Sequence, residues 1–404
     1  MKTWNSCLRK THKEQLLRQS FQVLLFFCTI TGVSAQTEDT TAFAFRTQPY
    51  LQNMTGNGVT IFWLTNAICT SWLEYGETQA LSKTALNSRD GLIDANVDVQ
   101  RVRLEKLTPG KSYFYRAASK RIKTYEAYKV IYGDTIYSPI YSFTVPSPTI
   151  GKFSFLVFND IHDRPQLLDT LSIIEKDYDF AFFNGDIVTD IYSEQQITKF
   201  LSVSSNSFAS SKPFFYTRGN HETRGPASRT LNKYLETPSG KFYYTAVVGQ
   251  AFFIVLDTGE DKPDTNQYYF GLAAFDRYRN EQARWLKNVV NSKEYRNAKF
   301  RIVCSHIPIS LKKGDGWHGM TECSKKFAPI LNSAKVDLHL CGHTHEARLI
   351  RLGQGPDRYV IVDGGTSSAR GKATYIKVDI AGSELRAALK KKDGSILDVV
   401  TINK

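Results

Sequence analysis

Several patterns that mark whole classes of protein are missing from this sequence of 404 residues. It contains no Cys-x-x-Cys pair, so a zinc-thiolate site is not expected. It also has no run of basic residues with interleaved aromatic side chains, so we expect no nucleic-acid partner. Internal repeats and low-complexity tracts are absent. The hydrophobic share of 42% and charged share of 23% are those of an ordinary globular protein.

The sequence also lacks an apolar run of the length that a membrane-spanning helix needs, since the hydrophobic stretch at residues 21–33 is shorter than that. It follows five basic residues and ends at the small-residue pattern Val33-Ser34-Ala35. We therefore expect residues 1–35 to be a cleaved signal peptide and the protein to be secreted or periplasmic, with no stable membrane span afterwards. An uncleaved anchor is the alternative. The leader has a net charge of +4, so its removal from +13 leaves +9, which favours anionic ligands.

Cysteines are few, and two of the six lie in the leader. Export would permit a disulfide among the remaining four. Cys304 and Cys341, however, fall on two predicted core strands. We therefore interpret them as small buried hydrophobic side chains.

The region from residue 43 to residue 146 shows strand patterns only. Strands are predicted at 59–64, 71–75, 99–104 and 137–145. A Pro-Gly turn before Tyr113 has the spacing of the tyrosine corner in sandwich domains. The region resembles the fibronectin type III-like β-sandwich that precedes the catalytic domain of purple acid phosphatases. We expect a structural or docking role for it.

From residue 151 to residue 404 the pattern changes to alternating strands and helices. Strands are predicted at 153–158, 180–183, 213–216, 300–304 and 336–340, and helices at 166–176, 197–208 and 281–290, while residues 327–331 are predicted to lie within a further helix. Ligands of such α/β sheets bind beyond the carboxyl ends of the strands. Those ends are therefore where the chemistry should lie.

Five strand ends carry Asp, His or Asn. In chain order the blocks are Asp160-Ile-His162, Gly185-Asp186, Gly219-Asn220-His221-Glu222, Ser305-His306 and Gly342-His343-Thr344-His345. Two carboxylates, four imidazoles and one amide make a mixed ligand set that suits zinc, iron and manganese. Because one carboxylate can bridge two cations, seven ligands are about right for a two-metal site.

The order of these blocks resembles the signature of calcineurin-like metallophosphoesterases, over residues 151 to about 380. The resemblance implies a four-layer αββα fold that holds two divalent or mixed-valence ions of Fe, Mn or Zn. It implies that one ion is bound by Asp160, His162, Asp186 and His345, and the other by Asp186, Asn220, His306 and His343. Asp186 would be the bridge. His221 would face the scissile phosphoester as the catalytic residue and protonate the leaving group.

The blocks also depart from the purple acid phosphatase pattern. Those enzymes have Asp-x-Gly in the first block and Gly-Asp-x-x-Tyr in the second. Here His162 takes the place of the glycine in the first block, and Thr189 takes the place of the tyrosine in the second. The tyrosinate that fixes ferric iron is missing, so purple-type redox chemistry is not expected.

Together these patterns predict an exported binuclear metallophosphoesterase that hydrolyses a small phosphomonoester by attack of metal-bridged hydroxide. A phosphodiesterase or nucleotidase is the enzymatic alternative. A non-catalytic, metal-stabilised surface binding protein is the alternative of another class. It would predict a degraded ligand set, whereas every ligand position is filled and His221 is present.

Other polar and aromatic residues receive weaker interpretations. Asp163 and Asp190 are either partners of ligand histidines or solvated loop charges. His318 is interpreted as a surface histidine. Residues 268–270 could form a pocket wall, although a packing cluster is the preferred interpretation. The loop at 258–279 carries no motif that reveals the substrate.

Overall fold

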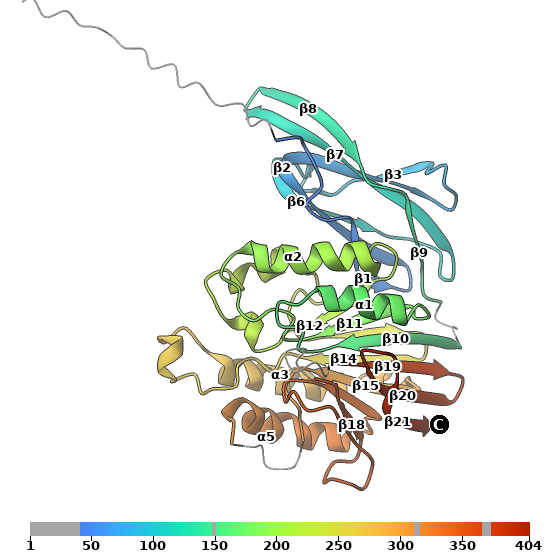
Figure 1. The fold of residues 1–404 in the computed structure, drawn as a ribbon, viewed down its shortest axis with the longest axis vertical. Coiled ribbons are helices and arrows are strands. Elements are labelled where there is room, and N and C mark those ends of the chain that lie inside the picture. The colour runs from blue at the N-terminus through green and yellow to red at the C-terminus, as the bar shows by residue number, and fades with distance from the viewer. Residues whose placement is uncertain (1–40, 148–150, 311–315, 366–372) are drawn as a thin grey trace, which may run out of the picture. The chain divides into compact units, whose positions relative to one another are not determined.

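The computed structural model describes residues 41–147, 151–310, 316–365 and 373–404 (Figure 1). The predicted signal peptide at residues 1–35 lies outside the described residues. The described strands form a sheet of 13, a sheet of six and a two-stranded ribbon. No helix in these ranges combines the length and apolar character that a membrane span requires.

The N-terminal region is built from strands alone, as its sequence predicts. These are β1 (Tyr50–Thr55), β2 (Gly58–Gly76), β3 (Lys83–Ala85), β4 (Ser88–Arg89), β5 (Leu92–Ile93), β6 (Val97–Leu104), β7 (Ser112–Glu126), β8 (Lys129–Tyr137) and β9 (Tyr141–Thr144). β2 is one strand of 19 residues where the sequence predicted two. Its pairing with β6 shifts register between Leu64 and Cys69, which interrupts the hydrophobic alternation without ending the strand.

The core of this region contains the predicted tyrosine corner. The hydroxyl of Tyr113 accepts a hydrogen bond of 3.1 Å from the backbone N–H of Thr108. Trp63 is fully buried, and its indole N–H donates to Ser119 Oγ at 2.8 Å. Buried aromatic residues need such partners for their polar atoms. The Trp63 bond joins β2 to β7, and the Tyr113 bond joins β7 to the loop before it.

Strand β1 joins the N-terminal strands to the later strands of the same 13-stranded sheet. It pairs in parallel with β12 (Phe214–Thr217), with Gln52 opposite Phe214. The buried hydroxyl of Tyr115 donates to the backbone oxygen of Ser210 at 2.7 Å. These contacts join the N-terminal strands to residues that follow position 150. A domain boundary at residues 146–151 stays a prediction.

The larger sheet continues through the strands that follow residue 151. β10 (Lys152–Phe158), β11 (Phe180–Asn184) and β12 run parallel, and β19 (Thr374–Ala381), β20 (Glu384–Lys391) and β21 (Ile396–Asn403) extend the other side as antiparallel strands. Helices α1 (Gln166–Ile174) and α2 (Glu194–Ser204) pack their apolar side chains on one face. Ser193 caps α2, and its side chain accepts from the backbone N–H of Gln195.

The six-stranded sheet faces the first. Its strands are β13 (Tyr244–Val248), β14 (Ala251–Leu256), β15 (Phe300–Ser305), β16 (Leu338–Cys341), β17 (Arg348–Ile350) and β18 (Val360–Asp363). β14, β15, β16 and β18 run parallel. Helices α3 (Phe275–Val289) and α4 (Lys293–Asn297) come between β14 and β15 in the chain, and α5 (His318–Ser333) comes between β15 and β16.

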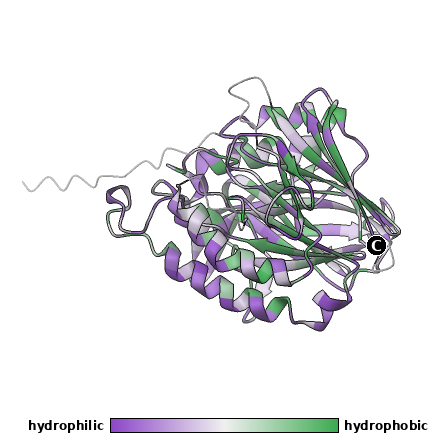
Figure 2. Ribbon diagram, turned by 90° about the horizontal axis from the view of Figure 1, so that it is seen from below, coloured by the Kyte–Doolittle hydropathy of each residue, from purple (hydrophilic) through white to green (hydrophobic). Residues whose placement is uncertain are grey.

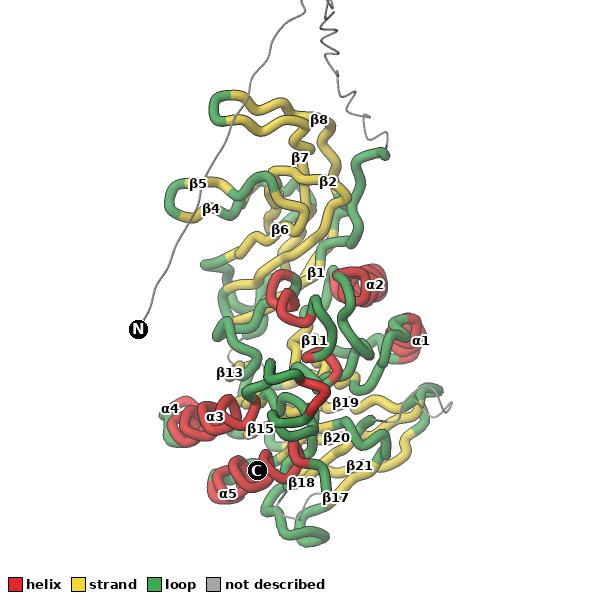
Figure 3. The backbone as a smooth tube through the Cα atoms, turned by 90° about the vertical axis from the view of Figure 1, so that its left-hand side faces the viewer, coloured by secondary structure: helices red, strands yellow, loops and turns green. Residues whose placement is uncertain are grey.

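Three buried clusters define the layers. One fills the space between the two sheets and contains Phe155, Phe182, Phe253, Ile302 and Leu340. Another lies under α1 and α2, and a third under α3 and α5. Figure 3 shows the strands between these two sets of helices, and Figure 2 shows the apolar strands enclosed by more polar helices. This confirms an α/β fold with the predicted order of helices, sheet, sheet and helices.

The cysteines follow the simpler interpretation. Cys69, Cys304, Cys323 and Cys341 are all free and buried. Burial raises the pKa of the Cys304 thiol well above its usual range, so this thiol is not reactive.

We predict that Tyr115→Phe lowers the free energy of unfolding by about 1–2 kcal/mol, because the Ser210 carbonyl loses its buried donor. Urea titration of the purified protein measures this change. Tyr128→Phe is the matched control, since Tyr128 is fully exposed. An unchanged midpoint in Tyr115→Phe would contradict the role given to this bond.

Candidate metal centre

The loops after five strands from the two sheets converge on one place. They follow β10, β11, β12, β15 and β16, and they carry all seven predicted ligands. Asp160, His162 and His345 form one group whose ligand atoms lie within 4.8 Å of one another, and Asp186, His306 and His343 form another. Side chains separated by up to 185 positions are thus brought together.

The first group is held at short distances. His162 Nε2 lies 3.1 Å from His345 Nε2, and His345 Nε2 lies 3.3 Å from Asp160 Oδ1. Three potential donor atoms therefore point at one small volume. His162 Nε2 is also 3.9 Å from Asp186 Oδ2, which connects this group to the second.

The second group is buried more deeply. His306 Nε2 lies 2.9 Å from Asp186 Oδ2, and Asn220 Oδ1 lies 3.0 Å from His343 Nδ1. Asp186 Oδ2 is thus the atom that both groups approach. Its other oxygen, Oδ1, accepts from the backbone N–H of His221 at 3.0 Å, which fixes the carboxylate.

Buried atoms without partners indicate what the site is built to hold. Asp160 Oδ1, His306 Nε2 and His343 Nε2 are buried and make no hydrogen bond. Although His306 Nε2 is close to Asp186, the pair lacks hydrogen-bond geometry. Leaving such groups unpaired is costly unless another partner is bound. The oxygen and imidazole donors therefore fit metal ions of the zinc, iron or manganese type.

The backbone of the ligands is unusual. Five of the seven have left-handed φ angles, at Asp160 (54°), His162 (47°), Asp186 (53°), His343 (72°) and His345 (58°). This conformation costs a non-glycine residue about 1–3 kcal/mol. Hydrogen bonds between the first two loops hold it, from Asp160 N–H to Gly185 O and from His162 N–H to Asp186 O. The sheets therefore support a strained site.

Glycines let the ligand loops approach each other. A Cβ at Gly219 would collide with the backbone and carboxylate of Asp186. A Cβ at Gly342 would lie 2.7 Å from Asp160 Oδ2. The two glycines that precede Asn220 and His343 are therefore required by close packing around the aspartates.

Glu222 supports the loops and received no role from the sequence. Its buried carboxylate accepts from the backbone N–H groups of Asp186 (2.9 Å), Ile187 (2.6 Å) and Gly219 (2.9 Å). Burial and the neighbouring Asp186 carboxylate raise the pKa of Glu222 to about 7. Its place in the Gly-Asn-His-Glu block was the only sequence signal for this role.

Asn184 connects the two sheets beneath the site. Its side-chain amide donates to Asn159 Oδ1 at 2.9 Å and to Ser305 O at 3.0 Å. Its backbone oxygen accepts from His306 Nδ1 at 3.0 Å. Because a carbonyl only accepts, this bond fixes the tautomer and directs Nε2 of His306 toward Asp186.

The charges of the site follow from burial and from the carboxylates. Burial lowers the pKa of His343 to about 3 and also lowers that of His162, so both rings are neutral near pH 7. Burial opposes the charge on His306 as well, yet Asp186 raises its pKa to about 10. The carboxylates of Asp186 and Asp160 therefore favour positive charge in the buried group that contains His306.

His221 lies beside the ligands. Its Nε2 is 3.8 Å from Asp186 Oδ2, and its Nδ1 donates to the backbone oxygen of Thr189 at 2.6 Å. It also forms a third possible metal-binding group with His162 and Asp186. Its predicted place outside the coordination shell therefore stays a prediction.

Arg224 was missed by the sequence analysis. Its Nη1 lies 3.1 Å from His221 Nε2, while its Nε and Nη2 bind the carboxylate of Glu260. A permanent positive charge is thus held beside His221. No sequence motif indicates this position of Arg224, because its partner Glu260 lies 36 positions away on another loop.

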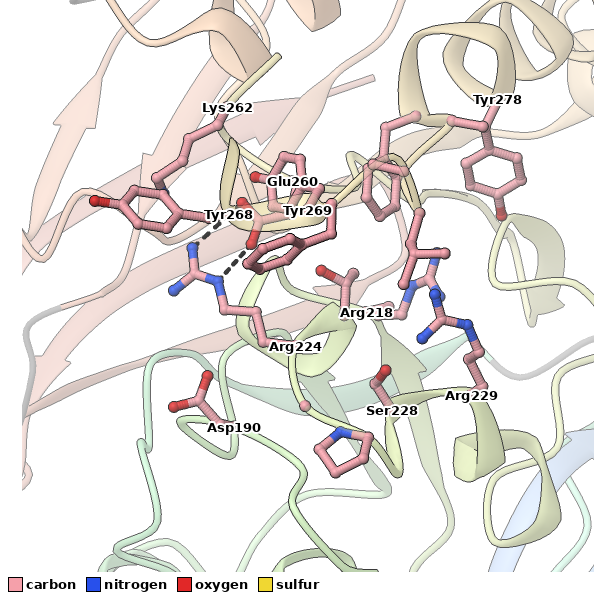
Figure 4. Close-up of a pocket in the computed structure, with 18 of the residues that line it drawn as sticks. Asp190, Arg218, Arg224, Ser228, Arg229, Glu260, Lys262, Tyr268, Tyr269 and Tyr278 are labelled. Atoms are coloured by element: carbon pink, nitrogen blue, oxygen red, sulfur yellow. Dashed lines mark hydrogen bonds and ion pairs between the residues drawn. The ribbon is translucent and has the colours of Figure 1, made fainter. Parts of the chain in front are cut away.

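The weaker candidates are also resolved. Asp163 is exposed in the turn after β10 and accepts from the backbone N–H of Thr189 at 3.0 Å, which agrees with a solvated loop charge and not with a partner of a ligand histidine. His318 pairs with Asp276 at 2.9 Å and is 31% exposed in its side chain. Asp190 lines a cavity of about 1000 Å³ (Figure 4).

The aromatic residues at 268–270 line the same cavity, so the packing interpretation is wrong for them. Tyr268 is 69% exposed and Phe270 is 86% exposed. The chain turns sharply here through a 3₁₀-helix, η4 (Gln267–Tyr269), which presents these rings outward. Sequence alone does not show on which side of such a turn a ring lies.

Comparisons with known proteins agree with this geometry. Residues 153–347 match the model of the calcineurin-like phosphoesterase family. The chain is 27% identical to purple acid phosphatase 4 of Arabidopsis thaliana over 253 residues, which are 56% of this chain and 71% of that protein. It is 25% identical to the serine/threonine-protein phosphatase CPPED1 of Mus musculus over 138 residues, 33% and 41% of the two chains.

Solved structures show a similar fold. The purple acid phosphatase PPD1 from yellow lupin seeds superposes with a TM-score of 0.64 at 17% identity, over 88% of this chain and 74% of that chain. PhoD gives a TM-score of 0.61 at 12% identity, over 88% and 89%. The shared fold thus extends beyond residues 153–347. The chain therefore contains a domain of the calcineurin-like metallophosphoesterase family and is a phosphoric ester hydrolase related in sequence to the purple acid phosphatases.

Proposed function

We propose that this protein is an exported phosphomonoesterase that uses two metal ions. Asp160, His162, Asp186 and His345 hold one ion, and Asp186, Asn220, His306 and His343 hold the other. The observation that carries the proposal is the convergence of these side chains on the Asp186 carboxylate. When bound, the ions supply Lewis acidity at the phosphate oxygens and lower the pKa of water.

His221 is proposed to donate the proton that the leaving oxygen needs. Its Nδ1 keeps a proton in the bond to Thr189 O, so the ring offers Nε2 on the side of the ligands. Because Arg224 can only donate, Nε2 accepts from its Nη1 while the ring is neutral; proton donation therefore requires a positively charged ring, with the leaving oxygen taking the place of this contact. Arg224 Nη1, 3.1 Å away, places a further positive charge where the departing oxygen gains negative charge.

Two further parts of the proposal concern the rest of the chain. The apolar stretch and cleavage pattern of residues 1–35 support export. The tyrosine corner at Tyr113 and the all-strand composition of residues 43–146 support a fibronectin type III-like sandwich before the catalytic domain.

Metal removal tests the function directly. We predict that the purified protein hydrolyses 4-nitrophenyl phosphate and that a chelator abolishes this turnover. Asp186→Asn should lower bound metal and turnover together, because an amide brings less charge between two cations. Metal content by mass spectrometry and initial rates measure both.

Asp393→Asn is the control for this substitution, since Asp393 lies in a turn before β21 and binds Ser395. It should retain metal and activity. An Asp186→Asn protein with two ions per chain and normal turnover would show that the bridge is assigned wrongly.

The second prediction concerns colour and pH. Thr189 stands where a phenolate would be needed, so iron-loaded protein should have no visible charge-transfer band. The activity optimum should be neutral or alkaline, because a divalent pair acidifies water less than ferric iron does. A purple protein with an acidic optimum would refute both statements.

The third prediction concerns His221. His221→Ala should keep its metal content and lose about 10²–10⁴-fold in kcat/KM on an alkyl phosphate, the usual contribution of a general acid. The loss on 4-nitrophenyl phosphate should be far smaller, because nitrophenolate leaves without a proton. Equal losses on both substrates would indicate a role in binding phosphate, and loss of metal would make His221 a ligand.

A further inference from the structure

The cavity of about 1000 Å³ lies directly beside His221. Arg224 is the link, because it lines the cavity and its Nη1 also lies 3.1 Å from His221 Nε2. Most of the remaining lining comes from two segments, residues 223–232 after the third ligand block and residues 260–278, and Asp190, Tyr192, Arg218 and Phe242 complete it. A phosphoryl group bound at the metal ligands would therefore direct its ester substituent toward this cavity.

One wall of the cavity presents apolar side chains to solvent. Tyr268, Phe270 and Leu272 line it and are 69%, 86% and 73% exposed. Phe270 has a left-handed backbone with φ 49°, which is unfavourable for a bulky side chain. The turn holds it there through Phe270 N–H to Gln267 O and Leu272 N–H to Tyr269 O. Exposed rings carried on a hydrogen-bonded turn at a cavity provide a surface on which a planar group can stack.

The cations of the cavity differ in their partners. Arg218 is bound to Asp257, Arg224 to Glu260 and Lys262 to Asp261. Arg229, on the 3₁₀-helix η3 (Ser228–Lys233), is exposed and makes no ion pair with any described residue. Asp190 lies on the opposite side of the pocket from Arg229 (Figure 4). Arg229 is therefore available to an anion at the end of the cavity away from the reacting phosphate.

We propose that this cavity is the leaving-group subsite and that its substrate is a phosphomonoester of a planar aromatic group carrying a second negative charge. Tyr268 and Phe270 stack on the aromatic group, and Arg229 binds the second charge. This inference rests on the proposed function. It makes Phe270 and Arg229 determinants of specificity without a part in the chemical step.

Two substrates isolate the charge. 4-(Carboxymethyl)phenyl phosphate and 4-methylphenyl phosphate have leaving groups of nearly equal basicity and differ by one carboxylate. We expect wild-type kcat/KM to be higher for the first. Arg229→Gln should lower kcat/KM for the carboxylate substrate about three- to tenfold and leave the methyl substrate unchanged, as expected for one solvent-accessible charge-assisted contact. Arg277→Gln, an exposed arginine of α3 outside the cavity lining, is the control.

Ethyl phosphate isolates the aromatic wall. Phe270→Ala should lower kcat/KM about tenfold for both aryl phosphates, which is the usual effect of removing one stacked ring, and leave ethyl phosphate unchanged. Tyr128→Ala removes a fully exposed ring elsewhere and should change none of the three. Both cavity side chains are exposed, so neither substitution should impair folding.

Equal losses of Arg229→Gln on the two aryl phosphates would overturn the assignment of the second charge. Equal losses of Phe270→Ala on aryl and ethyl phosphates would overturn the aromatic subsite. A wild-type protein that hydrolyses none of the three substrates with metal bound would instead overturn the proposed function, so the two failures are distinguishable.

Discussion

The site depends on the buried carboxylate of Asp186. A carboxylate removed from water needs compensating positive charge. Here His306 approaches the same oxygen that faces His162 and His221, at 2.9, 3.9 and 3.8 Å. The backbone N–H of His221 holds the carboxylate, and Glu222 holds the backbone N–H of Asp186. The loops from both sheets are thus arranged around one negative charge, which is the arrangement that a pair of cations requires.

The conformational cost of this arrangement falls on the ligand residues, whereas the contacts that support it are spread over both sheets. Five ligands adopt left-handed conformations, and buried ligand atoms lack partners. The cluster of aromatic and aliphatic residues between the sheets holds the strand ends in place, with Phe155 and Phe182 packed against Phe253 at 5.4 and 5.3 Å between ring centroids. Because the rigid sheets determine where the loops start, the strain is maintained where the chemistry takes place.

The sequence predicted the parts that are governed by local patterns. Buried strands read as short apolar runs, and polar residues at their carboxyl ends must meet when the strands are parallel. The convergence of the seven predicted residues was therefore accessible to prediction, together with the longer helices and the tyrosine corner, whereas their binding of metal stays a prediction. Arg224 and the exposed side of Tyr268 and Phe270 were not, because both depend on contacts between loops distant in sequence. The long strand β2 was missed because a register shift interrupts its alternation.

The central claim is that Asp186 bridges two metal ions, and element-specific anomalous diffraction from crystals of the purified protein tests it most directly. The account predicts two anomalous peaks roughly 3.5–4 Å apart, with Asp186 between them. One peak should also contact Asp160, and the other His306. A single peak, or metal bound only away from Asp186, would contradict the account.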